Sequence, residues 1–279
     1  MTRVAALLCL CLSLVAFACA PTTGGRPGRD SGGAGEDSGV MGVDLIMKDE
    51  ANPVFCAIRP PGHHATHDTA MGFCLFNNIA VAAAHALKTY GFKRIAILDF
   101  DVHHGNGTQW IFYDDPGVLT VSVHESGRHL FPGSGFPAET GGAGAPGSSV
   151  NVALAPFAGD DTYRAAMERV VVPAVRAFAP DAIVAQCGVD HHHADPLSHM
   201  LTTMPLYPDL WDALVGLADE ACEGRLVALG GGGYAPCTAP PRAWAALAAR
   251  MAGVAVGPAP VPASWRAIAL RAGCPQPPP

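Results

Sequence analysis

The sequence predicts an α/β fold, with three layers (α/β/α) around a mostly parallel central sheet. From residue 40 onward, short apolar or β-branched runs alternate with longer helical patterns, which is typical of consecutive βα units. The runs that begin at Arg94, Ala182 and Leu226 are nearly continuous in apolar residues. Strands that helices cover on both faces have this character, so the sheet is expected to lie between two helical layers.

The expected strands lie at 53–58, 94–99, 118–124, 149–154, 182–188 and 226–229. The expected helices lie at 77–90, 161–178, 207–222 and 241–251. The helix at 161–178 begins at an Asp-Asp pair suited to an N-cap and stops before Pro180. Parallel sheets bind ligands at the carboxyl ends of their strands, so functional residues should follow these strands directly.

Composition divides the chain into three parts. Residues 1–39 combine an apolar head with a Gly/Pro-rich tract and are not expected to belong to the fold, whereas 40–257 should form the folded domain and 258–279 a Pro-rich tail. The head, residues 1–20, is either a secretory signal or an accident of where the reading frame was opened. It is too short and wrongly flanked for a membrane span.

Charge and cysteine usage exclude several classes of protein. The net charge is −7 and no run of Lys or Arg is present, so no nucleic-acid partner is expected. The 9 cysteines contain no CxxC pair and favour reduced thiols, so no disulfide is expected. This pattern predicts a cytoplasmic protein, with export as the alternative if the head is a genuine signal.

Histidines and carboxylates cluster where the predicted strands end. Of the 12 histidines, seven lie in three short groups: His63-His64, His103-His104 and His191 to His193. The first group follows the first predicted strand, the second follows 94–99, and the third follows 182–188. Clustered imidazoles indicate metal or acid/base chemistry, and here they fall at one edge of one sheet.

Asp101 and His103 form the core of a candidate metal site. Alternate positions of an extended chain share a face, so these two side chains can converge on one point. Asp195, in a loop after a neighbouring strand, is the best-placed third ligand. Two carboxylates and one imidazole, with a position left for water, suit a catalytic zinc ion. Taken alone, the Asp-x-His pair could also be a local backbone contact beside a solvated histidine.

Several long motifs carry a resemblance to a known family. They are RPPGHHA (59–65), GFCLFNN (72–78), LDFDVHHGNGTQ (98–109), FPGSG (131–135), DHHHADPL (190–197) and GGGGY (230–234). Residues 53–234 resemble the catalytic domain of the histone deacetylase superfamily, which implies an arginase/deacetylase-like fold. PRAW (241–244) and VPASW (261–265) are similar to bacterial acetoin-utilisation deacetylases, while RPPGHH looks more like the class II branch. The family normally has a longer segment before RPPGHH, so the domain is expected to be truncated at its start.

The resemblance implies a role for each matching position. Zinc would be held by Asp101, His103 and Asp195, and the tandem pair beside the active water would be His63 and His64. Asp99 would orient His63, Asn106 would lie near His64, and Tyr234 would supply the phenol of the active site.

The resemblance also implies a substrate channel and a second cation. Phe73 and Phe131 would wall the channel, and Gly72 would lie at its floor. A potassium ion is expected near Asp99, Asp101, His103, Ser122 and Val123.

The function that the resemblance implies is zinc-dependent hydrolysis of an N-acetyl amide. The expected substrate is acetyl-lysine in a protein or, as an alternative, a small acetylated amine such as an acetylpolyamine. A truncated, non-catalytic zinc-binding relic or interaction module is a further alternative. A dinuclear manganese ureohydrolase is disfavoured, because such a site needs a carboxylate two residues beyond the histidine and position 105 is glycine.

Overall fold

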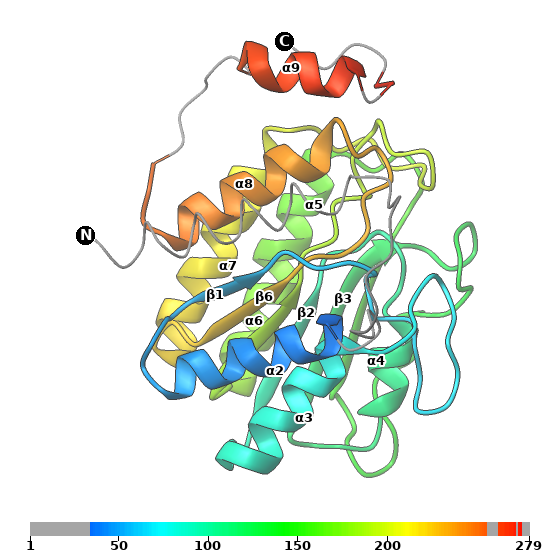
Figure 1. Cartoon of the computed structure of the whole chain (residues 1–279). Helices are drawn as coiled ribbons and strands as arrows, with labels where there is room; N and C mark the ends of the chain where they lie inside the picture. Colours follow the sequence, from blue (N-terminus) through cyan, green and yellow to red (C-terminus); the bar gives the residue numbers. More distant parts are fainter. Residues whose placement is uncertain (1–33, 256–261, 272, 275–279) are drawn as a thin grey trace.

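The fold is a single all-parallel sheet between two helical layers, which confirms the predicted class (Figure 1). The computed structural model describes residues 34–255, 262–271 and 273–274. The strand order is β1-β6-β5-β2-β3-β4. The strands are β1 (Val54–Cys56), β2 (Ile95–Asp99), β3 (Val118–Glu125), β4 (Ser149–Leu154), β5 (Ala182–Gln186) and β6 (Leu226–Leu229). Each lies within one predicted strand or extends it by one residue.

The helices cover both faces of the sheet. They are α2 (Ala34–Met47), α3 (Asn78–Tyr90), α4 (Asn106–Ile111), α5 (Asp160–Ala166), the π-helix η1 (Met167–Val171), α6 (Val172–Phe178), α7 (Leu206–Cys222), α8 (Ala239–Met251) and α9 (Ala263–Arg271). Helices α2 and α3 pack on one face and α5 to α8 on the other, while α9 lies beyond α8, away from the sheet (Figure 1).

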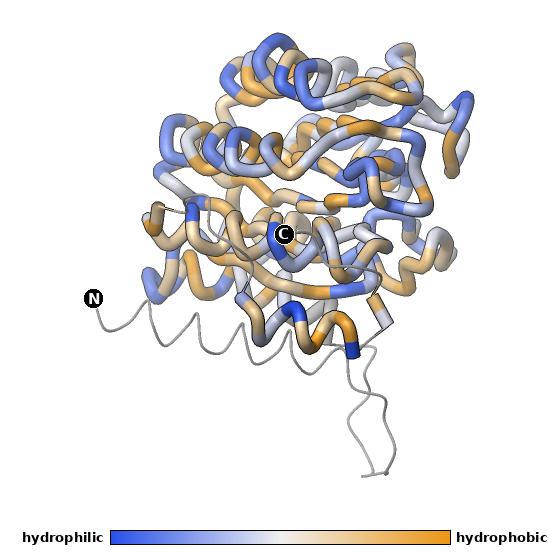
Figure 2. Tube along the Cα trace, turned by 90° about the horizontal axis from the view of Figure 1, so that it is seen from above, coloured by the Kyte–Doolittle hydropathy of each residue, from blue (hydrophilic) through white to orange (hydrophobic). Residues whose placement is uncertain are grey.

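Two apolar cores result from the alternation of side chains along the strands. On β2, Ile97 packs into the core beneath α2 and α3, whereas Leu98 packs into the core beneath α5 to α8. The second core centres on Trp211, which is fully buried and donates from its indole Nε1 to the Ala243 carbonyl at 2.9 Å. Hydrophilic and hydrophobic residues alternate along the outer helices, as one-sided burial requires (Figure 2).

Within the part of the chain that the structure describes, three helices were not predicted from the sequence: α2, α4 and α9. Helix α2 begins inside the tract that composition assigned to the head. The helix packs closely against its neighbours because Gly39 and Gly42 have no side chains to keep them apart. A Cβ at Gly39 would lie 3.0 Å from the Asn78 carbonyl oxygen. The division into head, domain and tail stays a prediction, and residues 1–33 lie outside the described part of the chain.

The helix predicted at 161–178 is interrupted. Its N-cap is Gly159 and not an aspartate, so the predicted Asp-Asp cap is wrong. Met167–Val171 form a π-helical turn, in which the backbone N–H of Val172 bonds to the Met167 carbonyl. Pro173 follows directly and has no N–H to continue the regular ladder, which accounts for the wider turn at this point.

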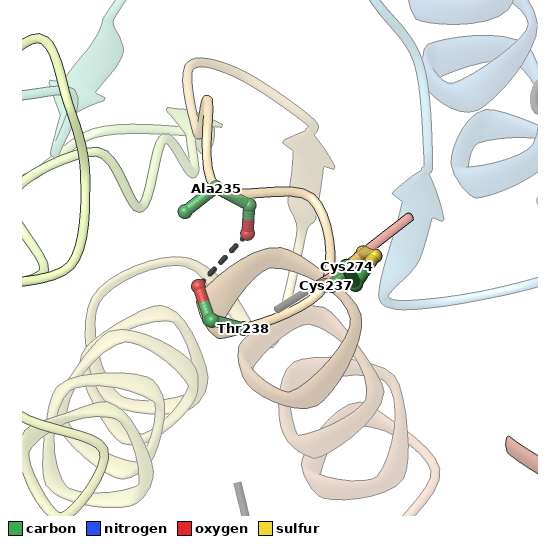
Figure 3. The surroundings of a disulfide bond; sticks show 4 residues. All are labelled: Ala235, Cys237, Thr238 and Cys274. Atoms are coloured by element: carbon green, nitrogen blue, oxygen red, sulfur yellow. Dashed lines mark hydrogen bonds between the residues drawn. A yellow bond between two sulfur atoms is a disulfide. The ribbon is translucent and has the colours of Figure 1, made fainter. Parts of the chain in front are cut away.

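The structure joins Cys237 and Cys274 in a disulfide bond, so the prediction that the chain would contain none is wrong (Figure 3). Cys237 lies in the turn before α8, and its Cα atom is 6.1 Å from that of Cys274, which follows α9. This distance is within the usual span of a disulfide. The pairing depends on where α9 lies against the domain, which cysteine spacing does not reveal. Cys187 and Cys222 are buried thiols, as expected.

No helix in the described ranges is both long and apolar enough to span a bilayer. The cytoplasmic location expected from the sequence stays a prediction.

Candidate functional site

Strand register brings the functional loops to one edge of the sheet. Asp99, the last residue of β2, lies opposite Ser122 of β3 on one side and Gln186 of β5 on the other. Gln186 in turn lies opposite Leu229, the last residue of β6. The loops that follow β2, β5 and β6 therefore start side by side, as expected for a parallel sheet.

Asp101 and His103 converge in the loop after β2. Asp101 is fully buried, and its Oδ1 accepts from the His103 backbone N–H at 3.1 Å and lies 3.0 Å from the His103 Nδ1. Its Oδ2 accepts from Gln186 Nε2 and from the Gly232 N–H, both at 2.8 Å. The carboxylate is thus fixed by donors from three strand ends. Gln186 was not among the predicted site residues, although a polar residue ending a buried apolar strand is a signal for it.

A second carboxylate, that of Asp190, completes a compact group with Asp101 and His103. Ligand atoms of Asp101, His103 and Asp190 all lie within 4.8 Å of one another. Asp190 Oδ2 is 3.1 Å from His103 Nδ1, and its Oδ1 accepts from the Val102 N–H at 2.8 Å. Asp195, the predicted third ligand, lies outside this group. Both residues belong to the same loop, and sequence does not show which one turns toward His103.

Asp195 instead holds the segment that carries Tyr234. Its Oδ2 accepts from the Tyr234 backbone N–H at 2.6 Å, and its Oδ1 accepts from the Leu197 N–H at 3.0 Å. Asp195 is 7% exposed, whereas Asp190 is 0% exposed, so Asp195 is the carboxylate that retains contact with solvent.

The compact group gathers two carboxylates around one imidazole in a buried place. Burial lowers the pKa of His103, but its hydrogen bonds to Asp101 and Asp190 outweigh this and raise it to about 11. Burial raises the pKa of Asp190 to about 7, assisted by the charge of Asp101. Burial also acts against ionisation of Asp101, yet the charges of His63 and His103 hold its pKa well below the usual range. Such a group binds a cation readily, because a positive ion can take the place of protons.

The tandem histidines border this group, and each is held by a different partner. His63 Nδ1 is 2.8 Å from Asp99 Oδ2, and His64 Nδ1 is 2.7 Å from Asn106 Oδ1. The two ring centroids are 4.0 Å apart, and that of His64 is 5.9 Å from the ring of His103. The two pairings expected from the resemblance are therefore present in the structure.

Their different partners give the two imidazoles different acidities. Burial lowers the pKa of His63, but the charges of Asp99 and Asp101 reverse the effect and raise it. Burial and the neighbouring charge of His63 lower the pKa of His64 to about 2. The two imidazoles are thus biased in opposite directions, His63 toward its charged form and His64 toward its neutral form.

Gly232, in the glycine run at 230–233, lets the backbone approach the site closely. A Cβ at Gly232 would lie 2.1 Å from Asp190 Oδ2 and 2.6 Å from Asp101 Oδ2. Only a residue without a side chain lets its N–H reach the Asp101 carboxylate here. A Cβ at Gly105 would lie 2.2 Å from Asp99 Oδ2, so a second carboxylate ligand at that position would need the site to be rebuilt.

Aromatic side chains surround the histidines and Tyr234. The Phe131 ring is 5.0 Å from that of His64, and the Phe73 ring is 5.8 Å from that of Tyr234. Phe73 and Phe131 are 70% and 46% exposed, so both lie at the surface end of the site. Gly72 lies against the His64 imidazole, where a Cβ would be only 2.2 Å from the ring. This placement agrees with a rim formed by the two phenylalanines, and the channel itself stays a prediction.

The potassium ion implied by the resemblance also stays a prediction. Its expected surroundings are Asp99, Asp101, His103, Ser122 and Val123. In the structure the Val123 carbonyl accepts from the Tyr163 hydroxyl at 3.2 Å, and the Ser122 hydroxyl pairs with His124 Nδ1 at 2.8 Å.

Comparison with known proteins gives consistent matches. The family model described as "Histone deacetylase domain" matches residues 34–251. The chain is 40% identical over 214 residues to a "Probable deacetylase" of Archaeoglobus fulgidus, covering 77% of this chain and 59% of that protein. It is 41% identical over 202 residues to "Histone deacetylase 14, chloroplastic" of Arabidopsis thaliana (71% and 47% covered). It is 39% identical over 203 residues to "Acetoin utilization protein AcuC" of Bacillus subtilis (73% and 52% covered).

A solved structure agrees with these matches. The crystal structure of the HDA15 HD domain superposes with a TM-score of 0.71 at 36% identity, covering 80% of this chain and 62% of that one. The chain thus spans between 47% and 59% of the length of these three curated relatives.

We predict that Gly232→Ala damages the site and the fold together. The new Cβ would collide with two buried carboxylates, so the free energy of unfolding should fall by about 1–3 kcal/mol, measured by urea denaturation. Gly216→Ala in α7 is the matched control, because the new Cβ would meet nothing within 4 Å and alanine favours a helix by roughly 1 kcal/mol. Equal stability of the two variants would contradict the close approach.

Proposed function

The chain belongs to the histone deacetylase family, a family of hydrolases, and we propose on this basis that it hydrolyses N-acetyl amides with one zinc ion. Acetyl-lysine in proteins is the proposed substrate class. The observation that carries the proposal is that a pair of histidines suited to acid/base chemistry lies beside a group of residues suited to metal binding. The paired imidazoles His63 and His64 border the buried Asp101–His103 pair, and the Tyr234 ring lies 6.5 Å from the His103 ring.

Asp101, His103 and Asp195 are the residues that we propose to hold the metal ion. Imidazole nitrogens and carboxylate oxygens are common zinc ligands, and a catalytic zinc site has three protein ligands with a further coordination position for water or substrate. Asp195 is favoured over Asp190 because it retains solvent contact and bonds to the backbone of Tyr234, so it faces the side from which a substrate arrives. Asp190, fully buried and bonded to the Val102 N–H, would then orient His103 from beneath.

His64 is the proposed proton carrier. When bound, the zinc ion supplies Lewis acidity, acidifying a water molecule and polarising the amide carbonyl. His64 donates from Nδ1 to Asn106 Oδ1, which leaves the lone pair of Nε2 available. That nitrogen is suited to take a proton from the attacking water and return it to the departing amine. His63, tied to Asp99, contributes mainly positive charge.

Tyr234 is the proposed donor to the developing oxyanion. Its backbone N–H is held by Asp195, and the centroid of its ring lies 5.8 Å from that of Phe73 and 6.5 Å from that of His103. Burial raises the pKa of its hydroxyl above the ordinary value, so the phenol keeps its proton and can donate it in a hydrogen bond. Phe73 and Phe131, exposed at the rim, offer apolar surface for the methylene chain of an acyl-lysine.

The proposed function is tested with the purified full chain. We expect one zinc ion per chain by metal analysis, release of acetate from an acetyl-lysine peptide, and block of that release by a hydroxamate. Zinc removal with a chelator should abolish turnover, and added zinc should restore it. Bound zinc without turnover would instead indicate a binding module, a pair of manganese ions would indicate a ureohydrolase, and a preference for N-acetylputrescine over the peptide would indicate an acetylpolyamine substrate.

The third ligand is tested by two isosteric substitutions. Asp195→Asn should weaken zinc binding by more than about 100-fold, because it removes a charged ligand. Asp190→Asn should weaken it by about 10- to 100-fold, as expected when a partner behind a ligand is lost. Zinc affinity is measured by competition with a chromophoric chelator. The reverse order would assign the third ligand to Asp190.

Tyr234→Phe is expected to slow turnover far more than it weakens binding. Loss of one oxyanion donor lowers kcat by about 10²- to 10³-fold. The KM for the acetyl-lysine peptide and the zinc content should change little, because the ring remains in place. Turnover near that of the parent protein would rule out this role for the hydroxyl.

A further inference from the structure

Arg59 connects two segments that both border the site. It follows β1, in the segment that leads to His63 and His64. Its Nη1 donates to the Gly233 carbonyl at 2.9 Å, across a sequence separation of 174 residues. Its Cζ also lies 5.1 Å from the centroid of the Tyr234 ring. The same guanidinium therefore contacts both the peptide before Tyr234 and the face of its ring.

The Tyr234 segment needs such a contact. Gly233 has a φ of +143°, a conformation that residues with side chains rarely adopt. As a glycine it has more backbone conformations available than other residues, so the peptide between Gly233 and Tyr234 is not fixed by local sterics alone. Asp195 fixes only the backbone N–H of Tyr234. Arg59 adds two further restraints, because its hydrogen bond to the Gly233 carbonyl helps to fix the peptide plane and its guanidinium over the ring face helps to fix the ring.

We propose that Arg59 is a positioning residue that holds the Tyr234 hydroxyl in its working orientation. The inference rests on the proposed function, in which that hydroxyl stabilises the oxyanion. Arginine suits the task because its planar guanidinium can stack on an aromatic ring while it donates to a carbonyl. Lysine has a positive charge and N–H donors but no planar group to stack on the ring, so it can replace the guanidinium only in part.

Two other roles are open to an exposed arginine, and they predict different results. An arginine that binds an anionic group of the substrate changes KM. An arginine that only joins β1 to the β6 loop changes stability, and its loss would slow any variant of the enzyme to the same extent. An arginine that acts through Tyr234 changes kcat, and only while the Tyr234 hydroxyl is present.

A double-mutant cycle with the zinc-loaded full chain separates these roles. Arg59→Ala should lower kcat on an acetyl-lysine peptide about 3- to 30-fold, with KM changed by less than about twofold. Arg59→Lys should recover part of the loss. In the Tyr234→Phe background, Arg59→Ala should change kcat by less than about twofold. Arg169→Ala is the control, because Arg169 is an exposed arginine of η1 outside the site.

A readout without turnover accompanies the kinetics. The chain is labelled with 3-fluorotyrosine, and the Tyr234 resonance is assigned by its loss in Tyr234→Phe. Arg59→Ala should shift or broaden this fluorine line, because the ring then samples several orientations, whereas Arg169→Ala should leave it unchanged.

The outcomes distinguish the inference from the function on which it depends. Equal losses from Arg59→Ala in both backgrounds, a change confined to KM, or an unchanged fluorine line would overturn the positioning role and leave the deacetylase proposal intact. Parent-like turnover of Tyr234→Phe would overturn the positioning role together with the proposed role of the hydroxyl, whereas absence of turnover in the zinc-loaded parent protein would overturn the deacetylase proposal itself.

Discussion

The burial of the Asp101 carboxylate is the constraint around which this site is built. An ionised carboxylate without solvent costs several kcal/mol unless charged or polar partners surround it. Asp101 is fully buried and receives donors from His103, Gln186 and Gly232, which come from the ends of three neighbouring strands. A cation that binds here would meet a carboxylate ligand that is already desolvated and oriented. The interactions that stabilise the carboxylate in the fold are therefore the interactions that prepare it to bind a metal ion.

The same charge divides the work between the two tandem histidines. The charges of Asp99 and Asp101 favour the charged form of His63, whereas the hydrogen-bond partner of His64 is the neutral amide of Asn106. Two adjacent imidazoles would otherwise compete for protons on equal terms. Their surroundings make the two imidazoles unequal: His63 is biased toward the charged form, while His64 is kept neutral, the form in which an imidazole nitrogen can accept a proton.

Sequence reasoning predicted the fold correctly and predicted that the candidate site residues lie at one edge of the sheet, and its errors have a common cause. The parallel sheet followed from apolar strands and from polar residues after them, both of which are local patterns. What was missed depends on contacts between distant segments. The contact of Asp190 with His103 was not predicted because only the fold of its loop brings the two together, and the Cys237–Cys274 bond depends on the position of α9. The helix α2 was missed because Gly39 and Gly42, which suggest a flexible tract, in fact permit close packing.

Register links the stability of the sheet to the chemistry at its edge. Asp99 lies opposite Ser122 and Gln186, and a slip of one residue would turn its side chain to the other face. Such a slip would be unfavourable because it would bury the Asp99 charge in an apolar core. The apolar side chains on both faces of β2 would also lose their packing partners. The charged end and the apolar body of the strand thus favour one register for different reasons. A site assembled from several strand ends can be precise because the whole sheet determines where each end lies.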